Sequence, residues 1–269
     1  MNHAFHIGPS KTATTWLYEN LRFHEQIRSS HTDTVHYYDL NAGKSTDWLS
    51  GSYEEITPAH KVQIELTPSY IRSVHTLNRI LTNHPDAKII FTMRNGYQRM
   101  LSHYWHEAKK NKVKYSLDDV LGHYDLYSTY VEPGMYADVL TWLVKCVPTD
   151  NIAIISYDSI KSNGTDVLYY LEEYLKIDHT SYPSAKKIIN PARSKSKHMQ
   201  ELIKKYLHRF KRARKSHGKE GRELKSEQRY PYSISVSDEV ASELKSRFDE
   251  DWSLSMELIE KHNVTFISP

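Results

Sequence analysis

The sequence predicts an α/β fold with a central parallel sheet flanked by helices on both faces. Apolar runs of strand length alternate along the chain with segments whose apolar side chains recur at helical spacing. The run at residues 88–93 is almost entirely apolar, which is typical of a parallel strand covered on both faces. The first run, at residues 4–7, ends in a Gly-Pro-Ser turn that leads directly into a helical segment.

Each element in the N-terminal half has its own signal. Leu17 and Leu21 lie at helical spacing and predict a helix over residues 14–23. Residues 61–65 alternate polar and apolar side chains, which predicts a strand. The apolar side chains of residues 70–83 again recur at helical spacing, so a helix should follow.

The C-terminal half continues the alternation. Asn95-Gly96 ends the strand at 88–93, and a second buried strand is predicted at 151–156. Residues 34–39 fit a short strand or a strand-like loop. The further predicted helices are 97–110, 136–145, 165–176, 199–213 and 237–261.

Length and composition fit one ordinary domain. We expect a single domain over residues 1–269, with a helical C-terminal part over about residues 197–269. The only cysteine, Cys146, excludes an internal disulfide and fits a reducing compartment. The N-terminus lacks the basic and apolar regions of a signal peptide, and no apolar run is long enough to span a membrane. We therefore expect a cytoplasmic protein with no membrane partner.

One segment is strongly basic. Residues 204–225 hold ten Lys and Arg against two Glu, so the remainder of the chain is net acidic although the whole carries +3. Such a block fits an anionic partner, and it fits a solvated helix and loop equally well. The second interpretation is the simpler one, and we expect no nucleic-acid partner.

The turn at residues 8–15, GPSKTATT, has the composition of a phosphate-binding loop. A turn between a strand and a helix N-terminus points several backbone N–H groups at one place, beside the positive end of the helix dipole. Lys11 would add a cation, and the Thr side chains would add hydroxyl donors. The loop is not a Walker A motif, because that motif needs a Gly-Lys pair. Alone, the pattern also fits an ordinary surface turn.

Three predicted strands end in charged or hydroxyl side chains. The first leads into the loop with Lys11, the second carries Glu65, and the third delivers Arg94, with Ser102 eight residues later. In an open α/β sheet, ligands bind at the carboxyl ends of the strands. Each residue has a structural alternative: Glu65 could pair with Arg94, and Ser102 could bond to the carbonyl of the preceding helical turn. Taken together, the three ends indicate a site for two anionic groups with a carboxylate between them.

These stretches resemble the motifs of sulfotransferases that use 3′-phosphoadenosine 5′-phosphosulfate (PAPS). The similarity is to the branch of the heparan sulfate 3-O-sulfotransferases and its bacterial relatives in particular. Residues 8–15 match the family's 5′-phosphosulfate loop, and residues 93–104, MRNGYQRMLSHY, match its 3′-phosphate motif. ELTPSY at 65–70 resembles the family's Glu-Lys-Thr-Pro segment, and HYYD at 36–39 resembles a His-Phe-Phe-Asp stretch. The resemblance spans roughly residues 4–200.

The resemblance implies a P-loop-like nucleotide-binding architecture, PAPS as the sulfuryl donor and no metal. Glu65 would be the general base, and Lys11 would stabilise charge on the bridging oxygen of the donor. Arg94 and Ser102 would bind the 3′-phosphate, and Arg193 would close over the donor. The loop residues expected at the donor are Ser10, Lys11, Thr12, Ala13, Thr14 and Thr15.

The acceptor side is less defined. His36 and Tyr37 are candidates for the acceptor pocket by resemblance. The chain departs from the branch at Leu66, which replaces a Lys, and this loss of a cation argues against a highly anionic glycosaminoglycan acceptor. Asn95-Gly96 replaces Asp-Pro, and Thr12-Ala13 replaces smaller residues, and both changes are compatible with a donor site.

Two other functions stay open. A P-loop nucleotide kinase shares the fold, but the sequence lacks the Gly-Lys-Ser/Thr and the Asp after a strand that would hold Mg²⁺. A non-catalytic protein that binds an anionic polymer through residues 204–225 would have no use for the strand-end cluster. We therefore predict a PAPS-dependent enzyme that sulfates a hydroxyl or amine of a small-molecule or carbohydrate acceptor. The sequence does not identify that acceptor.

Overall fold

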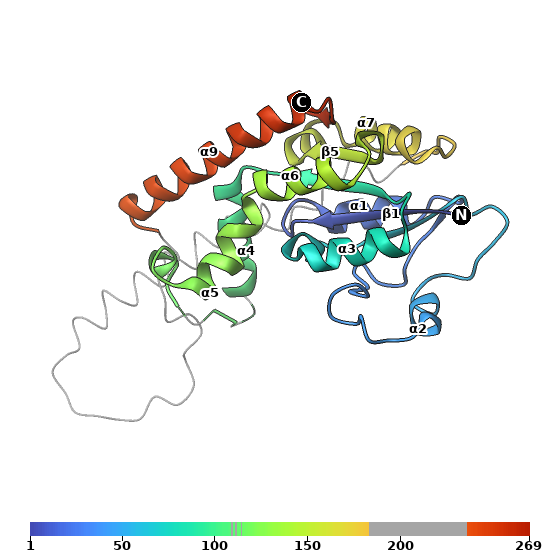
Figure 1. Ribbon diagram of the computed structural model, residues 1–269, viewed down its shortest axis with the longest axis horizontal. Helices are drawn as coiled ribbons and strands as arrows, with labels where there is room; N and C mark the ends of the chain where they lie inside the picture. The colour runs from blue at the N-terminus through green and yellow to red at the C-terminus, as the bar shows by residue number, and fades with distance from the viewer. Residues whose placement is uncertain (109, 111, 114, 183–235) are drawn as a thin grey trace. The chain divides into compact units, whose positions relative to one another are not determined.

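The computed structural model of the chain describes residues 1–108, 110, 112–113, 115–182 and 236–269. In these residues, strands and helices alternate and form a layered α/β unit (Figure 1). Three of the sequence predictions lie outside the described residues: the helix at 199–213, the basic segment at 204–225 and the donor contact Arg193.

Six strands form one sheet, and all neighbouring strands that the structure describes pair in parallel. The spatial order is β2-β3-β1-β4-β5-β6, so β1 has β3 and β4 as its neighbours. The predicted fold class is confirmed. The strands are β1 (Asn2–Gly8), β2 (Ile27–Arg28), β3 (Val62–Leu66), β4 (Lys88–Met93), β5 (Ile152–Ser156) and β6 (Thr265–Ile267).

Two strands escaped prediction because they are too short to show alternation. β2 has two residues and β6 has three. Residues 34–39, which fitted either a short strand or a loop, form a loop and turn.

The helices follow the predicted order. They are α1 (Thr14–Leu21), α2 (Thr46–Ser50), α3 (Val74–Asn83), α4 (Gly96–Ala108), α5 (Tyr124–Leu126), α6 (Ala137–Cys146), α7 (Tyr157–Leu175) and α9 (Asp238–Lys261). Short helical turns η1 (Tyr70–Arg72), η2 (Leu117–Asp119), η3 (Tyr127–Val131), η4 (Glu132–Gly134) and η5 (Thr149–Asn151) lie between them. α7 begins eight residues before its predicted start and is kinked at Asn163, where the backbone leaves the helical region. No described helix is long and apolar enough to cross a membrane.

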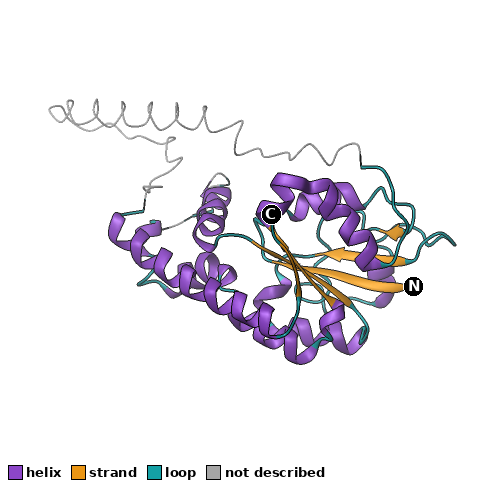
Figure 2. Ribbon diagram, turned by 90° about the horizontal axis from the view of Figure 1, so that it is seen from above, coloured by secondary structure: helices purple, strands orange, loops and turns teal. Residues whose placement is uncertain are grey.

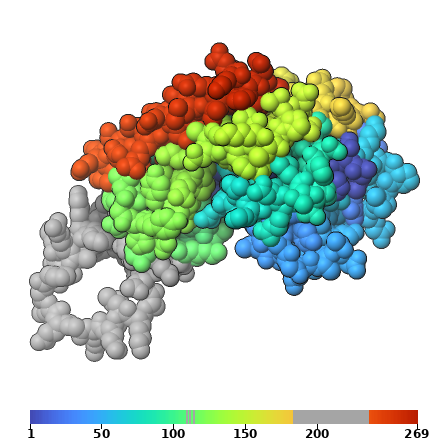
Figure 3. Space-filling model, in the orientation of Figure 1, coloured from blue at the N-terminus to red at the C-terminus, as the bar shows by residue number. Residues whose placement is uncertain are grey.

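The alternation of side chains along the strands divides the core into two layers. Phe5 and Ile7 of β1 and Phe91 and Met93 of β4 lie in one apolar cluster with buried side chains of α3, α6 and α9. Figure 3 shows these three helices (teal, yellow-green and red) adjacent on one face. Helices α1 and α7 lie on the opposite side of the sheet, so that helices cover both faces (Figure 2).

A chain of buried polar groups crosses from the sheet to the first loop. The fully buried His6 Nε2 lies 2.9 Å from Thr92 Oγ1, which is in close contact with Thr12 Oγ1. Thr12 donates its hydroxyl proton to Pro9 O at 2.6 Å. Thr12 uses its proton on Pro9 O, and Thr92 directs its own at Thr12 Oγ1 and, at 3.4 Å, at Gly8 O, so Thr92 accepts from His6. His6 is therefore held neutral with its proton on Nε2, and burial lowers its pKa to about 3.

We expect the protein to lose stability as the pH falls below the pKa of a free histidine, about 6.5. The folded state binds fewer protons than the unfolded state because the pKa of His6 is lowered on folding. Its contribution is complete above pH 6.5 and declines toward pH 3. Between pH 7 and pH 5, His6 alone should cost about 2 kcal/mol of unfolding free energy.

His6→Gln is the matched variant, because the Gln amide keeps an N–H donor toward Thr92 and cannot titrate. Urea unfolding at pH 7 and pH 5 should show a smaller decrease for the variant than for wild type. Part of the decrease should persist, since His3 and His103 also have pKa values lowered by burial. Equal decreases in the two proteins would contradict this account.

Candidate active site

The three strand ends predicted to carry the site belong to adjacent strands. β1 lies between β3 and β4, so the loop after β1 is flanked by the end of β3, which carries Glu65, and by Arg94 after β4. The guanidinium of Arg94 reaches the loop and donates to Lys11 O at 3.0 Å. The structure therefore brings Lys11 and Arg94 together, as the sequence predicted.

Three consecutive carbonyls of the loop after β1 accept hydrogen bonds from side chains. The donors come from the loop itself and from the chain that follows β4. The bonds are Thr12 Oγ1 to Pro9 O at 2.6 Å, Arg99 Nη1 to Ser10 O at 3.5 Å and Arg94 Nη1 to Lys11 O at 3.0 Å.

These bonds fix the direction of the loop's N–H groups. In a trans peptide the C=O and the following N–H point in opposite directions. The N–H groups of residues 10, 11 and 12 therefore each point away from the side chain that binds the carbonyl before them. Lys11 and Ala13 have positive φ angles of 73° and 81°, a backbone pattern that gathers N–H groups into an anion-binding concavity. α1 begins directly afterwards, without a side-chain cap.

Cations gather behind this loop without carboxylate partners. Arg94 is half-buried, its Nε has no hydrogen-bond partner, and its guanidinium lies 4.4 Å from the centre of the Tyr157 ring. Burial lowers the pKa of Arg94. Arg99 is fully buried, and neither Arg forms an ion pair with a described carboxylate. A buried cation without an ionic partner is costly, because its charge has lost water and gained no counterion.

The other predicted donor contacts differ in accessibility. The Thr12 hydroxyl is fully buried and satisfied within the loop, so only its N–H is directed toward the concavity. Thr14 is nearly buried and its hydroxyl has no partner, whereas Thr15 is exposed. Ser10 and Ser102 are half-buried. The roles of these residues at a donor stay predictions.

Glu65 is enclosed by hydroxyl groups. The residue is 2% exposed, and its Oε2 accepts from the Tyr53 hydroxyl at 2.9 Å. Its Oε1 accepts from the Thr67 hydroxyl at 3.1 Å and, at closer range, from the Tyr70 hydroxyl. Burial raises the pKa of Glu65, and these hydroxyl donors and the main chain of Tyr37 oppose that rise. The carboxylate has almost no surface through which an acceptor could contact it.

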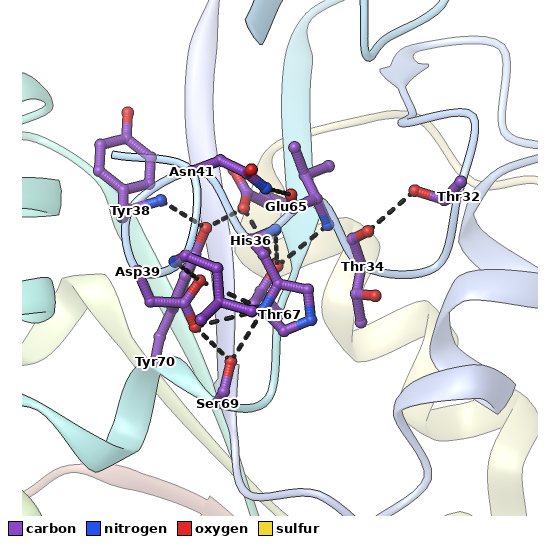
Figure 4. A network of polar contacts seen from close by, with 12 residues as sticks. Thr32, Thr34, His36, Tyr38, Asp39, Asn41, Glu65, Thr67, Ser69 and Tyr70 are labelled. Carbon is purple, nitrogen blue, oxygen red and sulfur yellow. Dashed lines mark hydrogen bonds and ion pairs between the residues drawn. The ribbon is translucent and has the colours of Figure 1, made fainter. Parts of the chain in front are cut away.

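The hydroxyls bound to Glu65 in turn hold the turn that carries His36. The main-chain N–H groups of Val35 and His36 both lie 3.3 Å from Thr67 Oγ1 and donate to it. The N–H of Tyr38 donates to the Tyr70 hydroxyl at 3.0 Å. Figure 4 shows this network from the carboxylate to the turn. The buried carboxylate therefore positions the turn through two intermediate hydroxyls.

His36 itself forms a second polar cluster, more exposed than the first. Its Nδ1 lies 3.2 Å from both carboxylate oxygens of Asp39 and 3.2 Å from Ser69 Oγ. Ser69 donates to Asp39 Oδ2 at 2.5 Å (Figure 4). Burial acts to raise the pKa of Asp39, but the hydrogen bonds from Ser69, the Leu40 N–H and His36 outweigh it and lower the pKa. Tyr37, in contrast, donates to Lys44 O at 3.3 Å.

The His36 cluster adjoins the loop after β1. Ser69 follows Pro68, and a Cβ atom on Gly8 would lie only 2.1 Å from Pro68 O. The N–H of Thr67 also donates to His6 O at 3.1 Å. The loop after β1 and the His36 cluster are therefore neighbours at the same edge of the sheet.

Known sulfotransferases resemble this chain in sequence and in fold. Residues 2–256 match the family model described as the sulfotransferase domain. The chain belongs to the sulfotransferase domain family. A solved sulfotransferase from Alicyclobacillus acidocaldarius superposes with a TM-score of 0.70 at 15% identity, covering 97% of this chain and 96% of the other. A mouse sulfotransferase complexed with PAP gives a TM-score of 0.53 at 15% identity, over 97% and 86% of the two chains. At these identities the two structures establish the sulfotransferase fold.

Curated sulfotransferases show distant sequence similarity. Mouse heparan sulfate glucosamine 3-O-sulfotransferase 6 is 25% identical over 63% of this chain and 50% of its own length. The membrane-associated sulfotransferase kil1 of Dictyostelium discoideum is 28% identical over 43% of this chain and 26% of its own length. The chain spans about a quarter to a half of the length of these relatives.

Several residues of the candidate site were not predicted from the sequence. Arg99 lies within the segment that resembles the 3′-phosphate motif, but only the tertiary structure shows its side chain buried against the loop. Asp39 lies in HYYD at 36–39, and Ser69 lies in ELTPSY at 65–70. The spacing of His36 and Asp39 is the sequence feature that could have indicated this cluster. Tyr53 lies in none of the motifs, because a helix and loops separate it in sequence from the other residues of the site.

Gly8→Ala should disrupt the junction between the two clusters. Gly8 has a φ of 117°, and a Cβ there would overlap the backbone of Pro68. We expect a loss of at least about 3 kcal/mol in unfolding free energy, measured by urea titration.

Gly43→Ala is the matched control, because nothing lies within 4 Å of a Cβ at that position. Its unfolding free energy should change by less than about 0.5 kcal/mol. Similar changes in unfolding free energy for the two substitutions would show that the contact of Gly8 with Pro68 is not important for stability.

Proposed function

We propose that this chain transfers a sulfuryl group from PAPS to a hydroxyl or amine of a small-molecule or carbohydrate acceptor. The observation that carries the proposal is the set of N–H groups of residues 10–12 beside Arg94 and Arg99, neither of which forms an ion pair with a described carboxylate. A phosphosulfate supplies the negative charge that such a site requires.

The described residues fit the two anionic ends of PAPS. The loop N–H groups and Lys11 are suited to the 5′-phosphosulfate. Arg94 is half-buried, and the accessible part of its guanidinium would bind the 3′-phosphate together with Ser102. Arg193 is proposed as a further contact by resemblance only. No step assigned to these residues requires a metal.

The chemistry is a displacement at sulfur. PAPS supplies the sulfuryl group, whose bond to the 5′-phosphate oxygen breaks as the acceptor oxygen or nitrogen bonds to sulfur. Lys11 and the directed N–H groups would stabilise the charge that develops on the departing phosphate oxygen. The adjacent His36 cluster would receive the acceptor. The rigid loop and the rigid turn would hold the two reactants in line.

The donor site is tested by calorimetric titration with adenosine 3′,5′-bisphosphate in the absence of Mg²⁺. Wild type should bind, and Arg94→Ala should weaken binding by about 30- to 100-fold because a charge-assisted bond to phosphate is lost. Arg79→Ala removes an exposed Arg on α3 and should bind like wild type.

A parallel titration with ATP and Mg²⁺ tests the alternative function, a P-loop nucleotide kinase. Binding of ATP with Mg²⁺, without binding of the bisphosphate, would favour a nucleotide kinase and overturn the sulfotransferase proposal. Binding of neither ligand would direct attention to an anionic polymer as the partner.

The reaction also requires a group that accepts the proton of the acceptor hydroxyl or amine. Glu65 is the base that the sequence predicts, but in this structure three hydroxyl donors surround its carboxylate. It could reach an acceptor only after one of those hydroxyls moved aside. His36 is a second candidate, about one-third exposed, at the end of the turn that Glu65 holds.

The hydrogen bonds of His36 support it as the base. Ser69 gives its proton to Asp39, so both neighbours of Nδ1 are acceptors. Nδ1 therefore carries the proton, and Nε2 is left as the basic nitrogen. The same division of roles occurs when an acidic partner orients a catalytic histidine through Nδ1. We therefore propose His36 as the group that accepts the proton, with Glu65 supporting it.

The variant His36→Asn tests whether His36 accepts the proton while Glu65 only supports it. Asn tolerates the left-handed backbone of His36, whose φ is 58°, and its amide can still donate to Asp39. We expect kcat to fall by about 10²- to 10⁴-fold at unchanged bisphosphate affinity. The assay uses PAPS with 2-naphthol and an unsulfated glucosamine disaccharide as probe acceptors.

The matched variant is Glu65→Gln, which keeps the shape of the side chain. If His36 is the base, this variant should lose about 1–3 kcal/mol of unfolding free energy and retain more kcat than His36→Asn. The opposite ranking would assign the base to Glu65. If neither probe is sulfated, ¹⁵N NMR of the imidazole decides: a proton on Nε2 would rule out His36 as the base.

The class of acceptor follows from the relatives only by analogy. Several are heparan sulfate glucosamine 3-O-sulfotransferases, which makes a carbohydrate hydroxyl the first acceptor to screen. Leu66 is buried in β3, so it offers no cation for a polyanionic acceptor. An uncharged or weakly charged acceptor therefore fits this site best.

A further inference from the structure

We propose that Arg99 is a positioning residue for the 5′ anion of the donor. Its guanidinium holds the Ser10 carbonyl behind the loop and supplies a buried positive charge that the bound anion neutralises. The inference rests on the proposed function, since the anion in question is the 5′-phosphosulfate of PAPS.

The side chain of Arg99 is enclosed within the protein. It is fully buried on α4, and its Nη2 donates to Tyr130 O at short range while its Nη1 lies 3.5 Å from Ser10 O. The Nε is buried without a partner. A Cβ on Gly134 would lie 3.0 Å from that Nε, so the backbone of η4 closes the remaining side. Among the described residues, Arg99 therefore hydrogen-bonds only to main-chain carbonyls and forms no ion pair with a carboxylate.

Two neighbouring arginines carry the same charge as Arg99. Burial lowers the pKa of Arg99 to about 10; the nearby Tyr136 acts to raise it, and the positive charges of Arg94 and Arg72 act to lower it further. Burial also lowers the pKa of His103, which is lowered further by Arg99, Lys11 and Arg72 among others. Without a ligand this cluster is destabilising, because desolvated like charges repel one another. An anion on the loop would reverse that balance.

The bond to Ser10 also has a geometric consequence. Because the peptide between Ser10 and Lys11 is trans, a carbonyl that points toward Arg99 leaves the Lys11 N–H pointing away from it, into the concavity. The same guanidinium also donates a hydrogen bond to Tyr130 O in η3. Arg99 thus ties the donor loop to a turn in the middle segment of the chain.

A purely structural role is the competing explanation, and the two explanations rank variants differently. Arg99→Lys keeps the charge but loses the forked geometry that reaches two carbonyls. Arg99→Gln keeps a donor for one carbonyl but removes the charge. If the charge matters, Gln should harm anion binding more than Lys; if only the carbonyl contacts matter, Lys should be no better than Gln.

The test is calorimetry with adenosine 3′,5′-bisphosphate, together with the rise in Tm that this ligand causes. We expect Arg99→Gln to weaken binding by about 10- to 100-fold and Arg99→Lys to stay within about threefold of wild type. The ligand-induced rise in Tm should shrink in the Gln variant only. Arg79→Gln is the control for the loss of one positive charge at an exposed position.

Several outcomes would overturn the inference. Equal binding by wild type and Arg99→Gln would leave Arg99 a structural residue while the proposed function stands. Failure of both Arg99→Gln and the apolar Arg99→Met to fold, with Arg99→Lys folded, would show that the fold itself requires the charge. If wild type does not bind the bisphosphate, the proposed function fails first, and this inference fails with it.

Discussion

The constraint on which the site depends is the anchoring of three consecutive carbonyls in the loop after β1. Thr12, Arg99 and Arg94 bind these carbonyls, so the peptide N–H that follows each carbonyl points away from the side chain that binds it. A backbone that is fixed in this way needs little rearrangement when an anion binds. The sheet order makes it possible, since β4 delivers both arginines beside β1.

A second constraint operates around Glu65. Its buried carboxylate binds the hydroxyls of Thr67 and Tyr70, and these hydroxyls accept main-chain N–H groups from the turn that carries His36. One charge thereby orders a segment that has no helix or strand of its own. Removing the carboxylate would leave several polar groups unsatisfied in the core, which is why such a residue can be essential without contacting a substrate.

The two constraints meet where Gly8 packs on Pro68. The anion-binding loop follows β1 and the His36 cluster depends on β3, and these strands are hydrogen-bonded neighbours. An acceptor held at His36 would therefore lie beside a donor on the loop, because both sites are built on one sheet edge.

The sequence by itself determined the fold class, the main strands and helices, and the placement of Lys11, Glu65 and Arg94 at the ends of three strands. These features depend on local periodicity and on strand-to-helix turns, which are visible in short windows. The tertiary structure alone decided the burial of Glu65, the role of Thr12 within the loop and the position of Arg99. The physical reason is that solvent exposure and hydrogen-bond partners depend on contacts between segments far apart in the chain, such as Arg99 with Ser10, and no local pattern encodes them.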